Sequence, residues 1–447
     1  MTRTAIDSGR EGSTPEPAPG PPASAGAARP VILQDPAPGP PEALYLHVPF
    51  CVSICPYCDF VVVAGAAARG PHNRMASFVS ALRREVELRA DALDDRWGGP
   101  ETAARPGRPA LRSLYLGGGT PSLLPAEAIA GLIELARARF GLAGDAEITI
   151  EANPGPDERG DPGVLAAAGV TRISFGAQAL DDATLRALGR RHRADDVEAA
   201  VLGARSAGIP SINLDLLYDV PGARVEDWMT TLEAALALEP NHLSLYALTL
   251  DDPDAEGLTG PAGDHLPVTR GARRWRVEAR SAQDEDRAAA MYEGATRRLA
   301  DAGFDDYEIS NWAQPGHESR HNLAYWQRRP YEAAGPGAHA FDGVTRRWNA
   351  ARLDAYLTAL TPADGGPGRL PPGGEEPVDP AAAAAEAVIL GLRTAAGIPL
   401  ELAERSPLAA HFAWALEAGL VTIAPEGRIV LTTRGRLLSN ELFARLV

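Results

Sequence analysis

The feature that most constrains the fold is a repeat in which a short β-rich run is followed by an amphipathic helical run. The expected strands cover residues 44–48, 113–116, 147–151, 172–175, 211–217 and 242–248. The expected helices cover residues 75–93, 126–139, 194–207, 225–238 and 287–302. Repeated βα units predict an α/β fold with a parallel sheet and helices outside it. Because six units are too few for the eight-fold barrel, we expect a partial (β/α)6, TIM-like barrel that is open on one side.

The segments around this repeat differ in composition. Residues 1–41 hold ten of the 39 prolines and no aromatic residue, so we expect a disordered tail rich in Pro and Ala. Residues 94–108 and 252–284 are typical of loops or long connections, and residues 361–380 form a break rich in Gly, Pro and acids. We expect the core domain to cover residues 42–345.

A small second domain is expected over residues 346–447. A helix is predicted over 381–392, and two short strands at 421–423 and 429–431 flank a PEGR turn. A last helix is predicted over 434–446. This order of elements indicates a C-terminal α+β domain that resembles a winged helix.

The charge balance limits the partners. The chain has 43 Lys and Arg residues against 59 Asp and Glu residues, a net charge of −16. Such an acidic chain is not expected to bind nucleic acid through a general basic surface. No uncharged apolar run approaches the ~18 residues of a membrane span, and the first residues lack the apolar core of a secretory signal. We therefore expect a cytoplasmic protein without a nucleic-acid partner, and leave association with a membrane surface and a homodimer open.

All three cysteines, Cys51, Cys55 and Cys58, lie in the loop after the first expected strand. An odd, clustered set is not a disulfide framework. Such loops at the carboxyl ends of strands carry active-site groups in open α/β sheets and barrels. Three thiolates can ligate three irons of a [4Fe–4S] cluster and leave the fourth iron open. A structural zinc site would need a fourth ligand, and His47 lies in a strand, where it is poorly placed for that role. We expect an iron–sulfur cluster, with His47 as a minor candidate for the cofactor pocket.

The C-x3-C-x2-C spacing after a first strand, with Tyr57 before the last cysteine, resembles the radical S-adenosylmethionine (SAM) superfamily. The six βα units agree with this resemblance. It implies a partial barrel of the radical SAM type. It also implies that SAM chelates the open iron through its amino and carboxylate groups, and that one electron from the cluster cleaves SAM to a 5′-deoxyadenosyl radical.

The resemblance also implies SAM contacts at strand ends around one mouth of the barrel. A Gly-rich turn, residues 117–121, follows the second expected strand, and by itself it could be a plain tight turn. Asp215 lies midway in an apolar strand, where an acid is costly to bury unless it is paired. The implied SAM contacts are Tyr45, Tyr57, Gly118, Gly119, Thr120, Glu151, Gln178, Arg190, Asp215 and Ala247.

Short strings from YLHVPFC to GPGAHA resemble the coproporphyrinogen-III-oxidase-like radical SAM family, which has two branches relevant here. The oxygen-independent coproporphyrinogen III oxidases make protoporphyrinogen IX by radical decarboxylation, and they carry a further cysteine where this chain has Phe60. The haem chaperone (HemW) branch carries Cys-Asp-Phe and His-Asn-x-x-Tyr-Trp, and both motifs are present. The chaperone branch implies haem as a ligand, delivery to haem-dependent respiratory enzymes, and an electron donor for the cluster. We assign no catalytic residue, and the oxidase or a radical SAM enzyme for another substrate remain the alternatives.

Residues 320–329 supply the haem-contact candidates. Imidazole is a common axial ligand of haem iron, aromatic rings offer flat faces to a porphyrin, and guanidinium groups pair with propionates. The haem candidates are His321, Asn322, Tyr325 and Trp326, with Arg320, Arg328 and Arg329 for the propionates. The alternative is a structural histidine beside core aromatics. His317 and His339 are nearby alternatives, and we interpret His72, His265 and His411 as structural.

Overall fold

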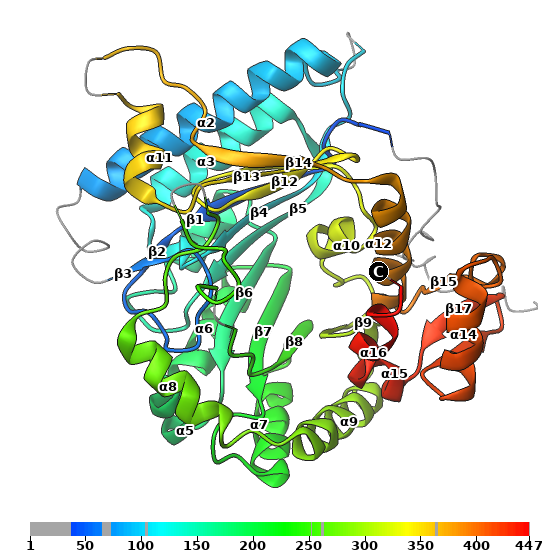
Figure 1. Cartoon of the computed structure of the whole chain (residues 1–447). Helices are drawn as coiled ribbons and strands as arrows, with labels where there is room; N and C mark the ends of the chain where they lie inside the picture. The colour runs from blue at the N-terminus through cyan, green and yellow to red at the C-terminus, as the bar shows by residue number, and fades with distance from the viewer. Residues whose placement is uncertain are drawn as a thin grey trace, which may run out of the picture.

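The computed structural model describes residues 37–64, 73–102, 106–251, 253–260, 263–362 and 365–446 (Figure 1). The predicted tail therefore lies outside the described residues except for residues 37–41, and His72 lies outside them too. No helix among the described residues has the length and the apolar character that a membrane crossing requires.

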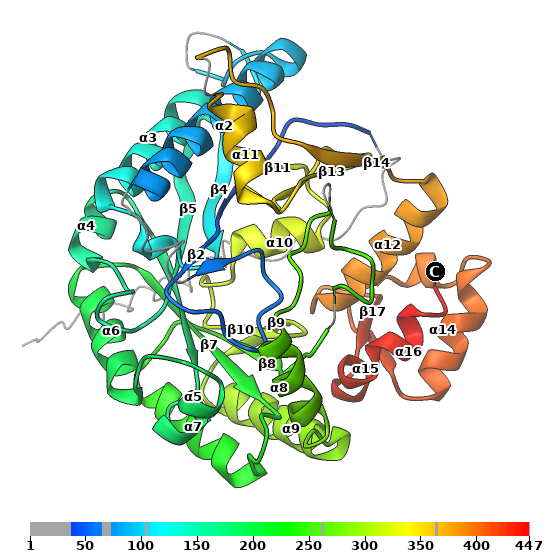
Figure 2. The same cartoon turned by 60° about the vertical axis from the view of Figure 1, so that its left-hand side comes forward.

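The main sheet contains the six predicted strands side by side and parallel. They are β1 (Ala43–Val48), β4 (Leu111–Gly118), β5 (Leu142–Ala152), β6 (Arg172–Gln178), β7 (Ser211–Tyr218) and β8 (His242–Ala247). Helices cover the outer face of this sheet (Figure 2). The prediction of an α/β partial barrel of the radical SAM type is confirmed.

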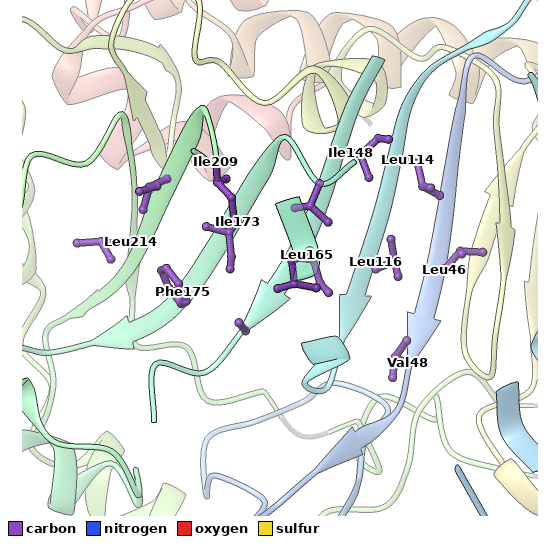
Figure 3. Packing of buried hydrophobic residues seen from close by; sticks show 14 of the residues in the cluster. Leu46, Val48, Leu114, Leu116, Ile148, Leu165, Ile173, Phe175, Ile209 and Leu214 are labelled. Atoms are coloured by element: carbon purple, nitrogen blue, oxygen red, sulfur yellow. The ribbon is translucent and has the colours of Figure 1, made fainter. Parts of the chain in front are cut away.

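The outer helices follow the strands in the βα order that the sequence predicted. They are α2 (Asn73–Trp97), α3 (Ala126–Phe140), α4 (Pro162–Ala167), α5 (Asp182–Ala187), α6 (Ala194–Ser206), α7 (Val225–Ala237) and α9 (Glu285–Asp301), with a 3-10 turn η1 (Pro121–Leu123) after β4. Figure 3 shows the apolar residues of the strands that pack beneath them, such as Leu116 and Ile173. Since side chains alternate along a strand, the neighbouring positions point into the barrel, and many of these are polar.

The sheet extends at both edges beyond the predicted strands. At one edge β11 (Tyr331–Ala334) pairs parallel with β1, and β12 (His339–Phe341), β13 (Thr345–Asn349) and β14 (Gly373–Pro377) follow antiparallel. At the other edge lie β10 (Asn311–Ala313) and β9 (Asp305–Glu308). The break expected over 361–380 thus contains β14, whose sequence GGEEP has no apolar alternation to mark it as a strand.

Several helices were not expected, among them the short α4 and α5 and the helices α8, α10 and α11. The long connection predicted over 252–284 contains α8 (Arg270–Arg280), in which five arginines hide the helical apolar pattern. α10 (Arg320–Trp326) lies inside the curve of the sheet (Figure 2), where His321 and Arg320 contact the starts of β4 and β5. A further helix, α11 (Leu353–Leu360), packs on α2.

The C-terminal part has its own apolar cluster and a three-stranded sheet. Its elements are α12 (Pro380–Arg393), β15 (Ile398–Pro399), α13 (Leu400–Ala403), α14 (Leu408–Glu417), β16 (Val421–Ala424), β17 (Arg428–Leu431), α15 (Thr433–Leu437) and α16 (Ser439–Phe443). The predicted last helix is thus divided at Leu438. The proposed boundary at 345/346 falls within β13, which pairs with β12 and β14, so we propose α12 as the start of the second domain.

The C-terminal domain is attached to the barrel through β9. The amide of Ile309 donates to the Arg393 carbonyl at 3.1 Å, and the amide of Ala395 donates to the Tyr307 carbonyl at 3.0 Å. Glu308 is fully buried beside this junction, where burial raises the pKa of its carboxyl group. Arg436 adds an ion pair with Asp306 at 2.7 Å. The domain therefore continues the edge of the main sheet.

Candidate functional site

A cavity of about 370 Å³ opens at the carboxyl ends of the parallel strands and reaches into the barrel. Most of the residues predicted for the site line it, although they come from six strands and the loops that follow them. They are Cys51, Cys55, Cys58, Tyr57, Gly118, Gly119, Thr120, Glu151, Gln178, Arg190, Asp215, Ala247 and Asn322. Tyr45, His321, Tyr325 and Trp326 are not among the lining residues.

The cysteine loop is closed by backbone pairing. β2 (Phe50–Cys51) pairs with β3 (Val63–Ala64), so both ends of the loop are held together. The Thr120 amide donates to the Phe50 carbonyl at 2.7 Å, which ties the Gly-rich turn to the cysteine loop. Two sequence motifs far apart in the chain thus form one rigid rim of the cavity.

His47 positions this loop and does not face the cavity as a ligand. Its Nε2 donates to the Val61 carbonyl at 2.8 Å, and its Nδ1 accepts from the Tyr45 hydroxyl at 3.0 Å. Burial lowers the pKa of His47 to about 4, so the ring is neutral and can serve both bonds. The Tyr45 ring packs beside Tyr115 and His321 below the cavity. Tyr45 therefore acts on the site through His47.

The cysteine side chains receive hydrogen bonds from across the cavity. Thr120 Oγ1 donates to Cys51 Sγ at 3.6 Å, and Arg190 Nη1 donates to Cys55 Sγ at 3.4 Å. Burial raises the pKa of Cys51 to about 11 and that of Cys58 to about 12. A thiol with such a pKa is deprotonated readily only when a positive centre binds it. Three thiols with these donors fit an iron–sulfur cluster held from one side.

The Gly-rich turn leaves no room for side chains. Gly118 has φ +110°, and a Cβ there would lie 2.4 Å from Cε1 of His47. Its amide donates to Glu151 Oε2 at 2.8 Å, while the Tyr115 hydroxyl donates to Oε1 at 2.8 Å. Burial raises the pKa of Glu151 to about 7, and the charge of Asp215 contributes in the same direction. Glu151 is thus a hydrogen-bond acceptor whose position is fixed by two donors. Its carboxylate takes up a proton easily as long as no cation lies beside it.

We expect Glu151→Gln to change how the stability of the cofactor-free protein depends on pH. The raised pKa means that Glu151 favours the folded state below about pH 4.5, and that this contribution is lost as the pH rises through about 7. Between pH 5 and pH 8 the wild type should lose up to about 3 kcal/mol relative to the variant, at 1.36 kcal/mol per pKa unit. Chemical unfolding of both proteins at each pH measures this difference. Glu134→Gln, at an exposed position of α3, should show none.

Around Asp215, the inner wall of the cavity holds polar residues that the sequence analysis did not single out: Arg172, Ser174 and Asn213. Asp215 accepts from Ser174 at 3.1 Å and from Asn213 at 2.7 Å. Arg172 is 3% exposed, and its Nε has no hydrogen-bond partner within the described residues. The sequence does contain a signal for Arg172 and Ser174, which is the alternation of side chains between the two faces of the strand RISFGAQ. Arg172 and Ser174 share the face of Gln178, which was predicted to line the site.

The histidine proposed as the axial haem ligand is enclosed. His321 is 1% exposed, and its Nδ1 lies 2.9 Å from Ser113 Oγ while its Nε2 lies 2.7 Å from the Tyr325 hydroxyl. Burial lowers the pKa of His321 to about 3. Because both ring nitrogens have partners and the side chain does not reach the cavity, this structure does not present His321 to a haem iron. The haem contact at His321 stays a prediction, and in this structure the ring contacts Ser113 and Tyr325.

The other haem candidates are also engaged within the fold. Tyr325 is half-buried and packs edge-on against His321, and Trp326 packs under the Arg393 guanidinium, 4.4 Å from its ring centroid. The arginines expected to meet propionates form ion pairs, Arg320 with Asp145, Arg328 with Glu386 and Arg329 with Glu42. Of the four haem-contact candidates only Asn322 reaches the cavity. In this structure the HNLAYW motif forms most of α10, which lies inside the curve of the sheet.

Comparison with known proteins shows where this site belongs. The family model of the radical SAM superfamily matches residues 45–235. The haem chaperone HemW of Mycobacterium tuberculosis is 38% identical over 90% of this chain and 94% of its own length. HemW of Bacillus subtilis is 31% identical over 90% of this chain and 98% of its own length.

Among solved structures, the coproporphyrinogen III oxidase (HemN) from Escherichia coli is similar with a TM-score of 0.70. The similarity covers 92% of this chain and 91% of that chain, at 22% sequence identity. This identity shows a shared fold alone, whereas the two HemW relatives are similar in sequence along nearly their whole length. The chain therefore belongs to the haem chaperone HemW family of the radical SAM superfamily.

Proposed function

We propose that this chain is a haem chaperone that binds a [4Fe–4S] cluster, SAM and haem, and that it delivers haem to haem-dependent respiratory enzymes. The observation that carries the proposal is the sequence similarity to proteins named haem chaperone HemW along about nine-tenths of the chain. Phe60 supports it, because the oxidases that this chain resembles carry a cysteine at that position.

Cys51, Cys55 and Cys58 would hold the cluster, and the chain has no other cysteine. When bound, the cluster supplies one electron to SAM at its open iron. The chain itself orients the sulfurs and adjusts their charge. The hydrogen bond from Thr120 favours the thiolate form of Cys51, because the donor stabilises negative charge on sulfur. Arg190 donates to Cys55 Sγ and so orients it.

Glu151 would accept the amino group of SAM. Tyr115 and the Gly118 amide already hold both carboxylate oxygens, so the carboxylate loses little further freedom when a ligand arrives. An ammonium group beside it favours the ionised form, since the attraction offsets the cost of burial. Gly119 and Thr120 continue this cradle, while Gln178, Arg190, Asp215 and Ala247 line the remainder of the cavity, where the ribose and adenine would lie.

The alternative is an oxygen-independent coproporphyrinogen III oxidase, a class of enzyme with which this chain shares its fold. One experiment separates the two. The anaerobically reconstituted protein is incubated with SAM, a reductant and coproporphyrinogen III, and a single chromatogram is read for protoporphyrinogen IX and 5′-deoxyadenosine. We expect no protoporphyrinogen IX. Its formation in step with 5′-deoxyadenosine would make the protein an oxidase and would overturn the chaperone proposal.

The chaperone proposal predicts a second result with the same preparation. Added haem should bind with a defined visible spectrum and should then pass to the apo form of a haem-dependent enzyme. The proposal also includes a location and partners for the protein. We propose that it is cytoplasmic, that it contacts the membrane surface where respiratory enzymes lie, that an electron donor serves it and that it forms a homodimer.

A further inference from the structure

One cationic side chain inside the barrel has no partner there. Arg172 begins β6 and is 3% exposed. The next residue, Ile173, packs on the outer face of the sheet (Figure 3), so alternation along the strand directs Arg172 inward, where it lines the cavity. Its Nε has no hydrogen-bond partner, and no ion pair joins its guanidinium group to an acid within the described residues. Because a buried charge without a partner is costly, a ligand in the cavity is the natural counter-ion.

The acids near Arg172 are bound by other donors. Burial disfavours the charge of Arg172, but the charges of Glu147 and Asp215 contribute to a pKa above the usual value, so the group is a cation. Glu147 accepts from the amides of Arg320 and His321 at 3.0 Å and 3.2 Å. Asp215 accepts from two side chains of the inner wall, as described above. These carboxylates therefore surround Arg172 without pairing with it.

The neighbouring strands also leave Arg172 without a partner. Thr149 on β5 and Ser211 on β7 are its Cα partners in the two adjacent strands. The side-chain hydroxyl oxygens of Thr149 and Ser211 are both buried, and neither has a hydrogen-bond partner in the part of the chain that the structure describes. Three adjacent strands thus place polar groups with unused hydrogen-bonding capacity at one depth of the barrel.

Asn322 supplies a second donor at this end of the cavity. It lies on α10, which contacts the starts of β4 and β5, and its side chain lines the same cavity as Arg172. The main-chain amide of Asn322 donates to Ser319, whereas its side-chain amide has no partner among the residues described. A guanidinium fork and a carboxamide N–H are the donors that a carboxylate accepts from best.

The depth of Arg172 separates it from the proposed place of SAM. Glu151, which would accept the amino group of SAM, is the Cα partner of Ser174. Arg172 comes two residues earlier on β6, which is about 7 Å deeper in the barrel. The carboxylate of SAM itself would lie at the open iron near the mouth. Burial raises the pKa of Glu151 and of Asp215, so both acids favour their neutral forms and repel an anion less.

We propose that Arg172, together with Asn322, binds the carboxylate of a second ligand beneath SAM. The ligand is a small organic carboxylate or the carboxylate-bearing arm of a larger molecule. The inference rests on the proposed function, because it takes SAM to occupy the outer part of the cavity. A planar guanidinium binds a carboxylate with two parallel hydrogen bonds, and the step transfers neither an electron nor a proton.

The test is a titration of the anaerobically reconstituted full chain, with SAM bound, with sodium propionate, followed by saturation-transfer NMR. Arg172→Gln should raise the Kd of propionate by about tenfold or more, because charge-assisted hydrogen bonds are lost. Arg172→Lys keeps the charge but not the fork and should bind with an intermediate Kd. Arg320→Gln is the matched control, since Arg320 pairs with Asp145 outside the cavity, and it should bind propionate as the wild type does.

Urea unfolding checks that the variants are folded and separates a ligand site from a structural role. Because Arg172 has no ion pair to lose, Arg172→Gln should unfold at the wild-type urea concentration or above it. A large loss of stability, with the Kd of propionate unchanged, would show that Arg172 is structural and would overturn the inference.

Haem and its dimethyl ester distinguish the two sources of the carboxylate. Weaker binding of haem by Arg172→Gln, with binding of the ester unchanged, would assign the site to a haem propionate. Unchanged binding of haem with weaker binding of propionate would assign it to a separate small carboxylate, and either result supports the inference. A loss of affinity for SAM alone would assign Arg172 to SAM and overturn it.

The inference and the chaperone proposal fail separately. Affinities for propionate and haem that do not depend on Arg172 would overturn the inference, and the chaperone proposal would stand if the wild type still binds haem and passes it on. A wild type that binds propionate through Arg172 but neither binds nor transfers haem would overturn the chaperone proposal and leave the carboxylate site.

Discussion

Cys55→Ala should abolish the [4Fe–4S] cluster, with iron and sulfide falling from about four of each per chain to nearly none. The reason is the donor set, since Cys51 and Cys58 are the only other cysteines and no further thiol can replace the lost ligand. Iron and sulfide analysis after anaerobic reconstitution, together with the brown visible absorbance, measures the loss. The variant should remain folded, because Cys55 lies in a loop and contributes nothing to the apolar core.

Ser53→Ala is the matched control for this prediction. Ser53 lies on the same loop and lines the same cavity, but its side chain is not a predicted ligand. It should take up the full complement of iron and sulfide. A Cys55→Ala protein that also retained the full complement would refute the assignment of the three cysteines as cluster ligands.

Glu85→Ala should lower the free energy of unfolding by about 3–5 kcal/mol. Glu85 on α2 is fully buried and forms a salt bridge with Arg89 at 3.0 Å. It also accepts from the Asn349 side chain, the Tyr356 hydroxyl and the Gly335 amide, each at 2.8 Å. Removing the carboxylate leaves the Arg89 charge buried without its counter-ion and three further donors without an acceptor.

Urea unfolding of the cofactor-free protein measures this loss, and Glu134→Ala provides the comparison. Glu134 pairs with Arg137 on the surface of α3 at 69% exposure, so its removal should cost less than about 1 kcal/mol. Equal losses in the two variants would show that the Glu85 network does not hold α2 to the β11–β13 edge of the sheet.

The parts of this protein that the sequence predicts are those encoded by local periodicity. The strands β1 and β4 to β8 are apolar runs that are separated by turn signals. Their carboxyl ends place the cysteines and Glu151 at one mouth of the barrel. The short strands β12 and β14 have no such pattern, because their stability comes from pairing with neighbouring strands and not from their own apolar alternation.

The haem residues show a second limit of sequence reasoning. His321 belongs to a distinctive motif, yet its ring is enclosed by Ser113 and Tyr325, which a linear motif does not reveal. Burial and the direction of a ring nitrogen are tertiary properties, so a linear motif indicates a class of ligand but not which side chain can reach it.

The attachment of the C-terminal domain through β9 has a consequence for truncation. A chain ending before α12 would lose the Arg393 and Ala395 partners of β9 and would leave this strand as a bare sheet edge. An open edge of this kind recruits other strands, so such a fragment would tend toward edge-to-edge aggregation. The small domain thus shields the β9 edge of the main sheet from other chains.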